Sequence, residues 1–363
     1  MTEAILEARN ESVRPWILAH VEETHMQRPS FLSEPRGVAL LGAGLSLGQP
    51  LAGVEQAPLA LRAAGLQKAI EEQNWDFSEG GDVNLSALQS TAVPAPFVPG
   101  QGLIKNSLLL GEACQKIAAN AEKIGRSRQM CLTLGGDHSV ALGSIAGLLR
   151  VWPNLSVIWV DAHGDFNTPD SSPSGNLHGM PLAGLTGAFA LNEHEGFDWF
   201  QAGLDPRRVA LVGIRSLDQG EKLLLKKSGV NVFTMTEIDR FGIGRVMDMA
   251  LAAVSAQGTG PLHLSYDIDA LDPTIAPSTG TRVRGGLNYR EAHYIAEAVA
   301  ETGRLVGMDL VEVNPGLSAR SQGQAHQSEP VQDSTVEIGI EIIESALGKR
   351  IFANDLESKK LTG

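Results

Sequence analysis

Short apolar runs alternate with longer amphipathic stretches along most of this chain. The apolar runs are bounded by polar residues or glycine and cover residues 37–42, 130–134, 156–160, 209–213, 230–233, 262–266 and 305–310. Strands that are apolar almost throughout are typical of a parallel sheet, whose two faces are both buried. The stretches with apolar residues at helical spacing are 57–72, 103–123, 140–149, 237–256 and 289–301. This alternation predicts an α/β protein with three layers (α/β/α) and a central, mostly parallel sheet.

The same pattern suggests how the chain is divided. A chain of 363 residues can form one large α/β domain. We expect residues 1–35 to be an N-terminal extension, residues 36–350 to form a single domain and residues 351–363 to be a C-terminal tail. Residues 316–334 are rich in Ser, Gln and Gly and are expected to form a surface loop. A last helix is expected directly after that loop.

Composition narrows the class of protein. The formal net charge of −13 argues against binding to nucleic acid, whose phosphates are also negative. No segment has the roughly 18 uninterrupted apolar residues of a membrane span. The first 30 residues contain several glutamates and no long apolar stretch, so they predict neither a signal peptide nor a transit peptide. We expect a cytoplasmic protein, with an organellar address left open, whose two cysteines, Cys114 and Cys131, are unpaired core thiols.

Acidic and imidazole side chains follow three of the expected strands. They occur in Gly135-Gly-Asp-His138, in Asp161-x-His163-x-Asp165 and in Asp267-x-Asp269. Each of these aspartates, taken singly, is more often a helix cap or a turn residue. In a parallel sheet, however, ligands bind at the carboxyl ends of the strands, and extended residues at i, i+2 and i+4 face the same side. Several carboxylates meeting there need cations, and oxygen and nitrogen ligands without thiolates favour manganese or a similar divalent ion.

At these residues the chain resembles the arginases of the ureohydrolase superfamily, over about residues 36–315 and into the last helix. The similarity is carried by Leu134-Gly-Gly-Asp-His-Ser-Val140, Asp161-Ala-His-Gly-Asp-Phe-Asn-Thr-Pro169, Ser174-Gly-Asn-Leu-His-Gly179, Ser265-Tyr-Asp-Ile-Asp-Ala-Leu-Asp-Pro273 and Met308-Asp-Leu-Val-Glu-Val-Asn-Pro315. It implies an arginase-like catalytic domain that holds two Mn²⁺ ions per subunit, with nickel or cobalt as possible replacements. One ion would be held by His138, Asp161, Asp165 and Asp267, and the other by His163, Asp161, Asp267 and Asp269. Asp165 would also orient a hydroxide that bridges the two ions.

The resemblance also assigns substrate contacts to a polar segment that, on composition alone, would be an ordinary surface loop. Asn167 and Ser174 match positions that receive the α-carboxylate of arginine, and Ser172 and Asn176 are further polar candidates in this loop. His178 matches a proposed proton shuttle to the leaving amine. Asp218, with Glu221 as the weaker candidate, would hold the α-amino group. Glu312 would face the substrate guanidinium, and Thr281 would line the pocket.

Two positions depart from the pattern of the family. Gly164 stands where threonine is common, and we expect little effect because alternation points this residue away from the metals. Ser216 stands where the animal enzymes have an acid, which affects how the amino group is recognised.

The resemblance implies hydrolysis of L-arginine to L-ornithine and urea by the bridging hydroxide, in a homotrimer or homohexamer. The alternatives are another ureohydrolase acting on agmatine, guanidinobutyrate or a smaller guanidine compound, and a metal-free arginase-like pseudoenzyme. A deacetylase-like zinc hydrolase is a further alternative, but such enzymes use one metal and fewer aspartates. The presence of Asn167, Ser174 and Asp218 argues against agmatine, which has no α-carboxylate.

Overall fold

The computed structural model describes residues 31–83, 85, 99, 101–317 and 333–349. The extension before residue 31, most of the expected loop at 316–334 and the tail after residue 350 lie outside these residues. Phe31 and Leu32, the first two described residues, pack against the hydrophobic core. No helix among the described residues is both long enough and apolar enough to cross a bilayer.

The described residues form an eight-stranded sheet in the order β2-β1-β3-β8-β7-β4-β5-β6, in which every neighbouring pair is parallel. The strands are β1 Gly37–Ala43, β2 Asp76–Asp82, β3 Met130–Gly135, β4 Ser156–Val160, β5 Val209–Ile214, β6 Asn231–Thr234, β7 Leu262–Asp267 and β8 Leu305–Val311. The expected parallel α/β fold is confirmed. Strand β2 was not predicted, because its sequence DFSEGGD is polar and mostly solvent-exposed at the sheet edge.

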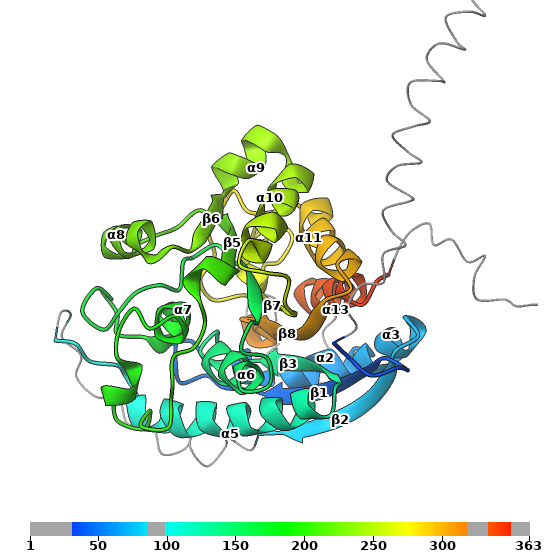
Figure 1. Ribbon diagram of the computed structural model, residues 1–363, viewed down its shortest axis with the longest axis horizontal. Helices are drawn as coiled ribbons and strands as arrows, with labels where there is room; N and C mark the ends of the chain where they lie inside the picture. The colour runs from blue at the N-terminus through cyan, green and yellow to red at the C-terminus, as the bar shows by residue number, and fades with distance from the viewer. Residues whose placement is uncertain (1–30, 84, 86–98, 100, 318–332, 350–363) are drawn as a thin grey trace, which may run out of the picture. The chain divides into compact units, whose positions relative to one another are not determined.

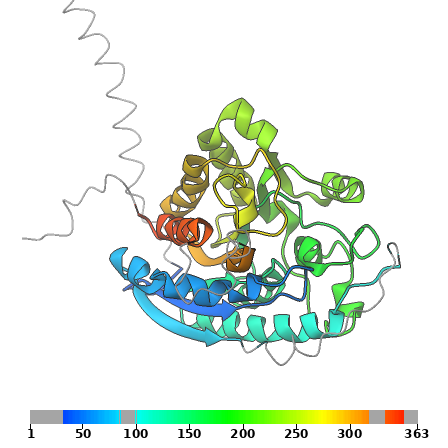
Figure 2. The ribbon, with the colours of Figure 1, turned by 180° about the vertical axis from the view of Figure 1, so that it is seen from behind.

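Helices cover both faces of the sheet (Figures 1 and 2). The helices are α2 Ala57–Ala63, α3 Leu66–Glu72, α5 Ser107–Arg126, α6 Val140–Leu149, α7 Pro181–Leu185, α8 Gln219–Ser228, α9 Met235–Phe241, α10 Ile243–Ser255, α11 Tyr289–Glu301 and α13 Ser334–Ala346. Buried residues of α2, α3, α9, α10, α11 and α13 share one core cluster with strand residues such as Leu40 and Ile158. Buried residues of α5, α6, α7 and α8 belong to a second core cluster, together with Leu41 and Trp159, which directly follow Leu40 and Ile158 in their strands. Successive strand residues therefore point to opposite faces of the sheet and pack into different cores.

Two of the predicted helices are each divided in two. Residues 57–72 form α2 and α3, which meet at Gly65 with a φ of 97°, and residues 237–256 fall across α9 and α10, which meet at Gly242 with a φ of 75°. A left-handed backbone at glycine ends a helix without steric cost, so the apolar spacing continues while the axis changes. The predicted last helix is confirmed as α13, and it begins at Ser334, where the loop was expected to end.

Candidate metal centre and substrate pocket

The acidic segments converge at the carboxyl ends of four adjacent strands. Strands β3, β8, β7 and β4 are neighbours in that order, and they lead into His138, Glu312, Asp267 and Asp161 respectively. Residues more than 170 positions apart in the sequence thereby come into contact, as in the hydrogen bond from the His138 backbone N–H to Glu312 Oε1 at 3.0 Å. The site forms because strands from distant parts of the chain are adjacent in the sheet.

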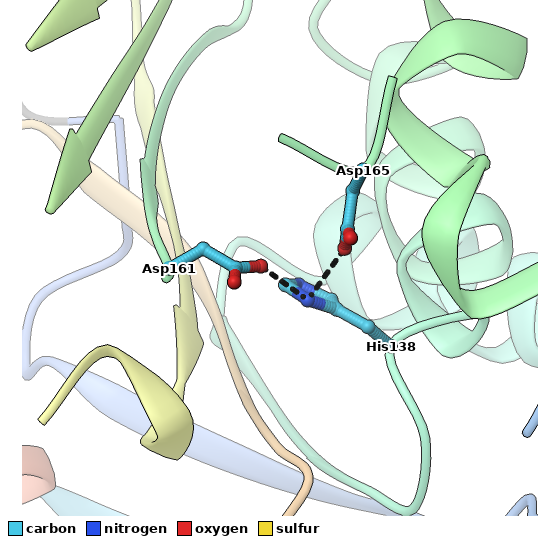
Figure 3. A group of neighbouring side chains, drawn as sticks. All are labelled: His138, Asp161 and Asp165. Atoms are coloured by element: carbon cyan, nitrogen blue, oxygen red, sulfur yellow. Dashed lines mark ion pairs between the residues drawn. The ribbon is translucent and has the colours of Figure 1, made fainter. Parts of the chain in front are cut away.

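His138 lies at the centre of one group of ligands (Figure 3). Its Nδ1 is 3.2 Å from Asp161 Oδ2, 3.0 Å from Asp165 Oδ2 and 3.3 Å from Asp267 Oδ2. The ring is held from behind, because Nε2 lies 2.9 Å from Ser265 Oγ and the ring stacks on Trp159 at a centroid distance of 4.2 Å. The Ser265 contact and the stacking leave Nδ1 directed at the three carboxylates.

His163 lies at the centre of a second group, which shares Asp161 with the first. His163 Nδ1 is 3.1 Å from Asp269 Oδ2 and 3.4 Å from Asp161 Oδ1. Asp161 therefore presents one oxygen to each histidine. Asp269 is oriented by the Thr281 hydroxyl, which donates to its Oδ2 at 2.7 Å, and by the Ala162 N–H, which donates to its Oδ1 at 3.2 Å.

The cluster fits a pair of divalent cations. His138 Nδ1 and Asp165 Oδ2 are buried and lack a hydrogen-bond partner of good geometry, which is costly unless a cation is held there. Ligand atoms of His138, Asp161 and Asp165, and likewise those of Asp161, His163 and Asp269, lie within 4.8 Å of one another. These nitrogen and oxygen donors suit a divalent transition ion such as manganese.

The electrostatics of the cluster show the same need for positive charge. Burial, with the charge of Asp161, raises the pKa of Asp165 to about 7, and burial also raises the pKa of Asp267 well above its usual range. Burial alone would lower the pKa of His163, but Asp269 and Asp161 raise it to about 12. Bound cations would relieve this repulsion between buried carboxylates, and their binding would displace protons from the ligands.

A cavity of about 150 Å³ opens above the two ligand groups, a size that suits a small molecule. Ten of the predicted site residues line it: His163, Asp165, Asn167, Ser172, Ser174, His178, Asp218, Glu221, Asp267 and Thr281. Asp218 is the N-cap of helix α8, and Glu221 at N3 completes a capping box with it. Asn167 is tied to this helix start, because its Nδ2 donates to Asp218 Oδ2 at 3.0 Å.

His178 and Glu312 form an ion pair beside this cavity, with Nδ1 3.0 Å from Oε1. Burial alone would lower the pKa of His178, but the hydrogen bond and charge of Glu312 raise it to about 9. The imidazole is therefore protonated at neutral pH in the metal-free protein and can donate a proton into the cavity. Glu312 is itself outside the cavity lining and is 1% exposed.

Comparison with known proteins agrees with this geometry. Residues 36–348 match the model of the arginase family. The chain is 40% identical to arginase from Glaciozyma antarctica over 326 residues, which cover 89% of this chain and 90% of that protein. It is 42% identical to human arginase-1 over 287 residues, covering 78% of this chain and 87% of that one. The chain belongs to the arginase family.

The family is also recognised in three dimensions. The solved arginase from Bacillus caldovelox aligns with a TM-score of 0.76 at 36% identity, over 87% of this chain and 100% of that chain. Arginases are binuclear metal hydrolases, and the two ligand groups that share Asp161 are the corresponding feature of this member.

The expectation that Asp161, His163 and Asp165 converge as alternate residues of one extended strand is wrong for this arginase-family chain. Strand β4 ends at Val160, so Asp161, His163 and Asp165 are not successive residues of one strand face. Asp165 has a φ of 50°, in the left-handed region, and Asp269 lies in the short 3-10 helix η6 Ile268–Ala270. The ligands meet because the loops bend after the strands end. Such bends depend on contacts with other segments and cannot be read from an alternating pattern.

Position 164 faces the start of helix α8. A Cβ built there would lie 2.6 Å from Leu217 Cδ2 and 2.7 Å from Glu221 Oε1. Leu217 and the buried Glu221 occupy the space into which a side chain at position 164 would point. In this chain the glycine therefore allows the start of α8 to pack directly on the metal loop.

Two of the predicted substrate contacts, Asn176 and Glu312, do not line the cavity, and Asn176 is turned to another partner. Asn176 Oδ1 accepts a hydrogen bond from Lys105 Nζ at 3.3 Å. Conversely, the sequence analysis did not identify Trp159, Ser265 or Arg215 as parts of the site. Trp159 and Ser265 are within strands, where a packing role is the ordinary expectation, although each precedes a ligand by two residues.

Proposed function

We propose that this protein hydrolyses L-arginine to L-ornithine and urea with two divalent metal ions, of which manganese is the expected one. The observation that carries the proposal is the pair of ligand groups sharing Asp161 beneath a cavity with opposed polar walls. Two ions held there would lower the pKa of water and so supply a nucleophile at neutral pH. By family resemblance, we also propose a homotrimer or homohexamer.

The walls of the cavity suit an α-amino acid. Asn167, Ser172 and Ser174 bring amide and hydroxyl groups from one loop, which we assign to the α-carboxylate. Asp218 and Glu221 bring carboxylates from the start of α8, which we assign to the α-amino group. The guanidinium would then point to the acidic end of the cavity, where Glu312 behind His178 adds negative charge.

Proton transfer is assigned to Asp165 and His178. Asp165 lines the cavity at the ligand cluster, where its carboxylate can accept a proton from the nucleophile and return it to the leaving group. His178 lines the cavity from the side of Glu312 and can protonate the departing amine of ornithine. Its countercharge, Glu312, keeps the imidazole charged until that transfer.

The proposal is tested by urea release. Chelator-treated protein is reloaded with manganese, nickel or cobalt and assayed with L-arginine, agmatine, guanidinobutyrate and guanidine. We expect L-arginine to be the preferred substrate and manganese to restore the most activity. Equal or faster turnover of agmatine would contradict the assignment of the substrate, and absence of urea from every compound would contradict the proposed class of reaction.

Recognition of the α-carboxylate can be tested separately. We expect the double variant Asn167→Ala/Ser174→Ala to raise KM for L-arginine by roughly 10- to 100-fold, because a hydrogen bond to a charged group contributes about 1.5–3 kcal/mol. Agmatine lacks this carboxylate, so any residual turnover of agmatine should not fall. Ser107→Ala is the control, since Ser107 Oγ bonds the Glu195 carbonyl outside the cavity lining. An unchanged KM for L-arginine would refute the assignment.

The packing at Gly164 gives a further prediction. We expect Gly164→Thr to raise KM for L-arginine and to lower stability by about 1–3 kcal/mol, because the new side chain must displace Leu217 and Glu221. The added variant Leu217→Ala should recover part of both losses. Steady-state kinetics and thermal unfolding measure the two effects. Gly203→Ala is the control, since a Cβ there has no neighbour closer than 4.0 Å. A KM equal to that of wild type in Gly164→Thr would contradict this prediction, because it would show that the start of α8 shifts to make room without affecting substrate binding.

A further inference from the structure

Arg215 follows strand β5 and donates hydrogen bonds to backbone carbonyls of three segments. Its Nη2 donates to Asp269 O at 2.7 Å and to Val283 O at 2.9 Å, and its Nη1 donates to Ala270 O at 2.9 Å. Further bonds reach Leu271 O at 3.2 Å and Gly213 O at 3.3 Å. One guanidinium thereby joins the end of β5, the η6 turn and the loop around Val283.

These segments carry one of the two ligand groups. Asp269 lies in η6, and Thr281, which orients the Asp269 carboxylate, lies with Val283 in the loop between η6 and α11. The backbone N–H groups of Arg215 and Ser216 both donate to Ala162 O at 2.9 Å, between the ligands Asp161 and His163. Arg215 thus touches the surroundings of His163, Asp161 and Asp269, whereas no bond of its side chain reaches His138 or Asp165 in the described part of the chain.

The fit around the guanidinium is close. A Cβ added to Gly286 would lie 2.6 Å from Arg215 Nη2, so this position in the pocket loop accommodates no side chain without a shift. Asp272 accepts hydrogen bonds from the Gly285 and Gly286 N–H groups and holds that turn in place. The charge of Arg215 also lies within electrostatic range of Asp269, Asp161, Asp272 and Asp267.

We propose that Arg215 is a positioning residue that holds Asp269 in place for the ion bound by His163, Asp161 and Asp269, without contacting either ion or the substrate. The planar guanidinium has five N–H donors in a fixed geometry, and it stays charged under all relevant conditions. A lysine would keep the charge but has three donors on one nitrogen, so it cannot reach carbonyls of all three segments. This inference rests on the proposed two-ion centre but not on the choice of substrate.

The test measures binding of Mn²⁺ to the full-length, chelator-treated protein. Calorimetric titration gives the affinities, and metal analysis after dialysis gives the number of ions retained. We compare wild type with Arg215→Met and Arg215→Lys. We expect the wild type to bind two ions per chain. In Arg215→Met one ion should bind as in wild type, and the other roughly 10- to 100-fold more weakly, the usual effect of losing an outer partner of a metal ligand. Arg215→Lys should weaken the same ion by a smaller factor.

Arg304→Lys is the matched control. Arg304 is buried and donates from Nε to Gly260 O at 2.6 Å and from Nη1 to Ser255 Oγ at 2.8 Å, near the amino ends of β7 and β8. The variant Arg304→Lys should lower thermal stability without changing the affinity for either ion. The inference is overturned if Arg215→Met and Arg215→Lys bind both ions like wild type, or if they weaken both ions equally. If Arg215→Met does not fold, Arg215→Lys decides. A wild type that binds no pair of ions would overturn the proposed function as well.

Discussion

Asp161→Asn is expected to abolish binding of both ions and to lower kcat for urea release by at least about 1,000-fold, or ~4 kcal/mol. Asp161 belongs to both ligand groups, with Oδ2 3.2 Å from His138 Nδ1 and Oδ1 3.4 Å from His163 Nδ1. Asparagine has nearly the same shape and can still accept the hydrogen bond from Trp159 Nε1. It presents one oxygen and no charge, so it cannot serve two cations at once. Metal analysis and the urea assay measure the two effects.

The matched control for this variant is Asp333→Asn. Asp333 is a buried aspartate that caps α13 through the Thr335 N–H at 2.9 Å, and asparagine caps helices equally well. We expect Asp333→Asn to keep both ions and nearly full activity. Asp161→Asn should retain its circular dichroism spectrum, which separates loss of metal from loss of fold. Stoichiometric metal in a folded Asp161→Asn would show that the shared carboxylate is not the bridge.

Glu312→Gln is expected to lower kcat/KM for L-arginine by roughly 30-fold to several thousand-fold without loss of metal. Truncating one member of a buried, hydrogen-bonded charge pair costs about 2–5 kcal/mol, and each 1.4 kcal/mol is a factor of ten. Glutamine can still accept the His138 N–H, so the ligand is expected to stay in place. The lost charge is the countercharge of His178 and, in our assignment, of the substrate guanidinium.

The same variant has a pH signature that a purely structural change would not produce. Burial lowers the pKa of His178, but Glu312, with further charge from Asp137 and Asp165, raises it from 6.5 to about 9. In Glu312→Gln this pKa should fall, as measured by NMR of the imidazole. The pair stabilises the folded state fully below pH 6.5, and this contribution is lost as the pH rises through about 9. The difference in stability between wild type and variant should shrink over that window.

Glu344→Gln is the control for Glu312→Gln, because Glu344 is a mostly buried glutamate paired with Lys349 at 2.6 Å, outside the cavity lining. It should leave kcat/KM and the His178 titration unchanged. An unaltered pKa of His178 in Glu312→Gln would show that another group keeps the imidazole charged.

The local patterns of the sequence are sufficient for most of the fold. Strand β4 and helices α6 and α11 have the bounds that hydrophobic spacing predicts. One or both faces of such a segment are buried, and this burial requires apolar residues at regular spacing, so the segment can be recognised from the sequence itself. Strand β2 shows the opposite case, since its pairing with β1 comes from backbone hydrogen bonds that polar residues form equally well. The break at Gly242 is likewise absent from the apolar spacing, which continues across it while the backbone turns at the glycine.

The sequence by itself determined which chemical groups stand at the strand ends, and therefore that His138, Asp161, Asp165 and Asp267 could share cations. This follows because parallel strands present their carboxyl ends at one edge whatever the loops do. Only the tertiary structure decided which atoms face each other. The backbone at Asp165 is left-handed, which the pattern does not predict. The direct contact at Gly164 and the hydrogen bonds from Arg215 to the Asp269 turn join segments distant in sequence. Loop conformation depends on those distant partners, and a local pattern contains no record of them.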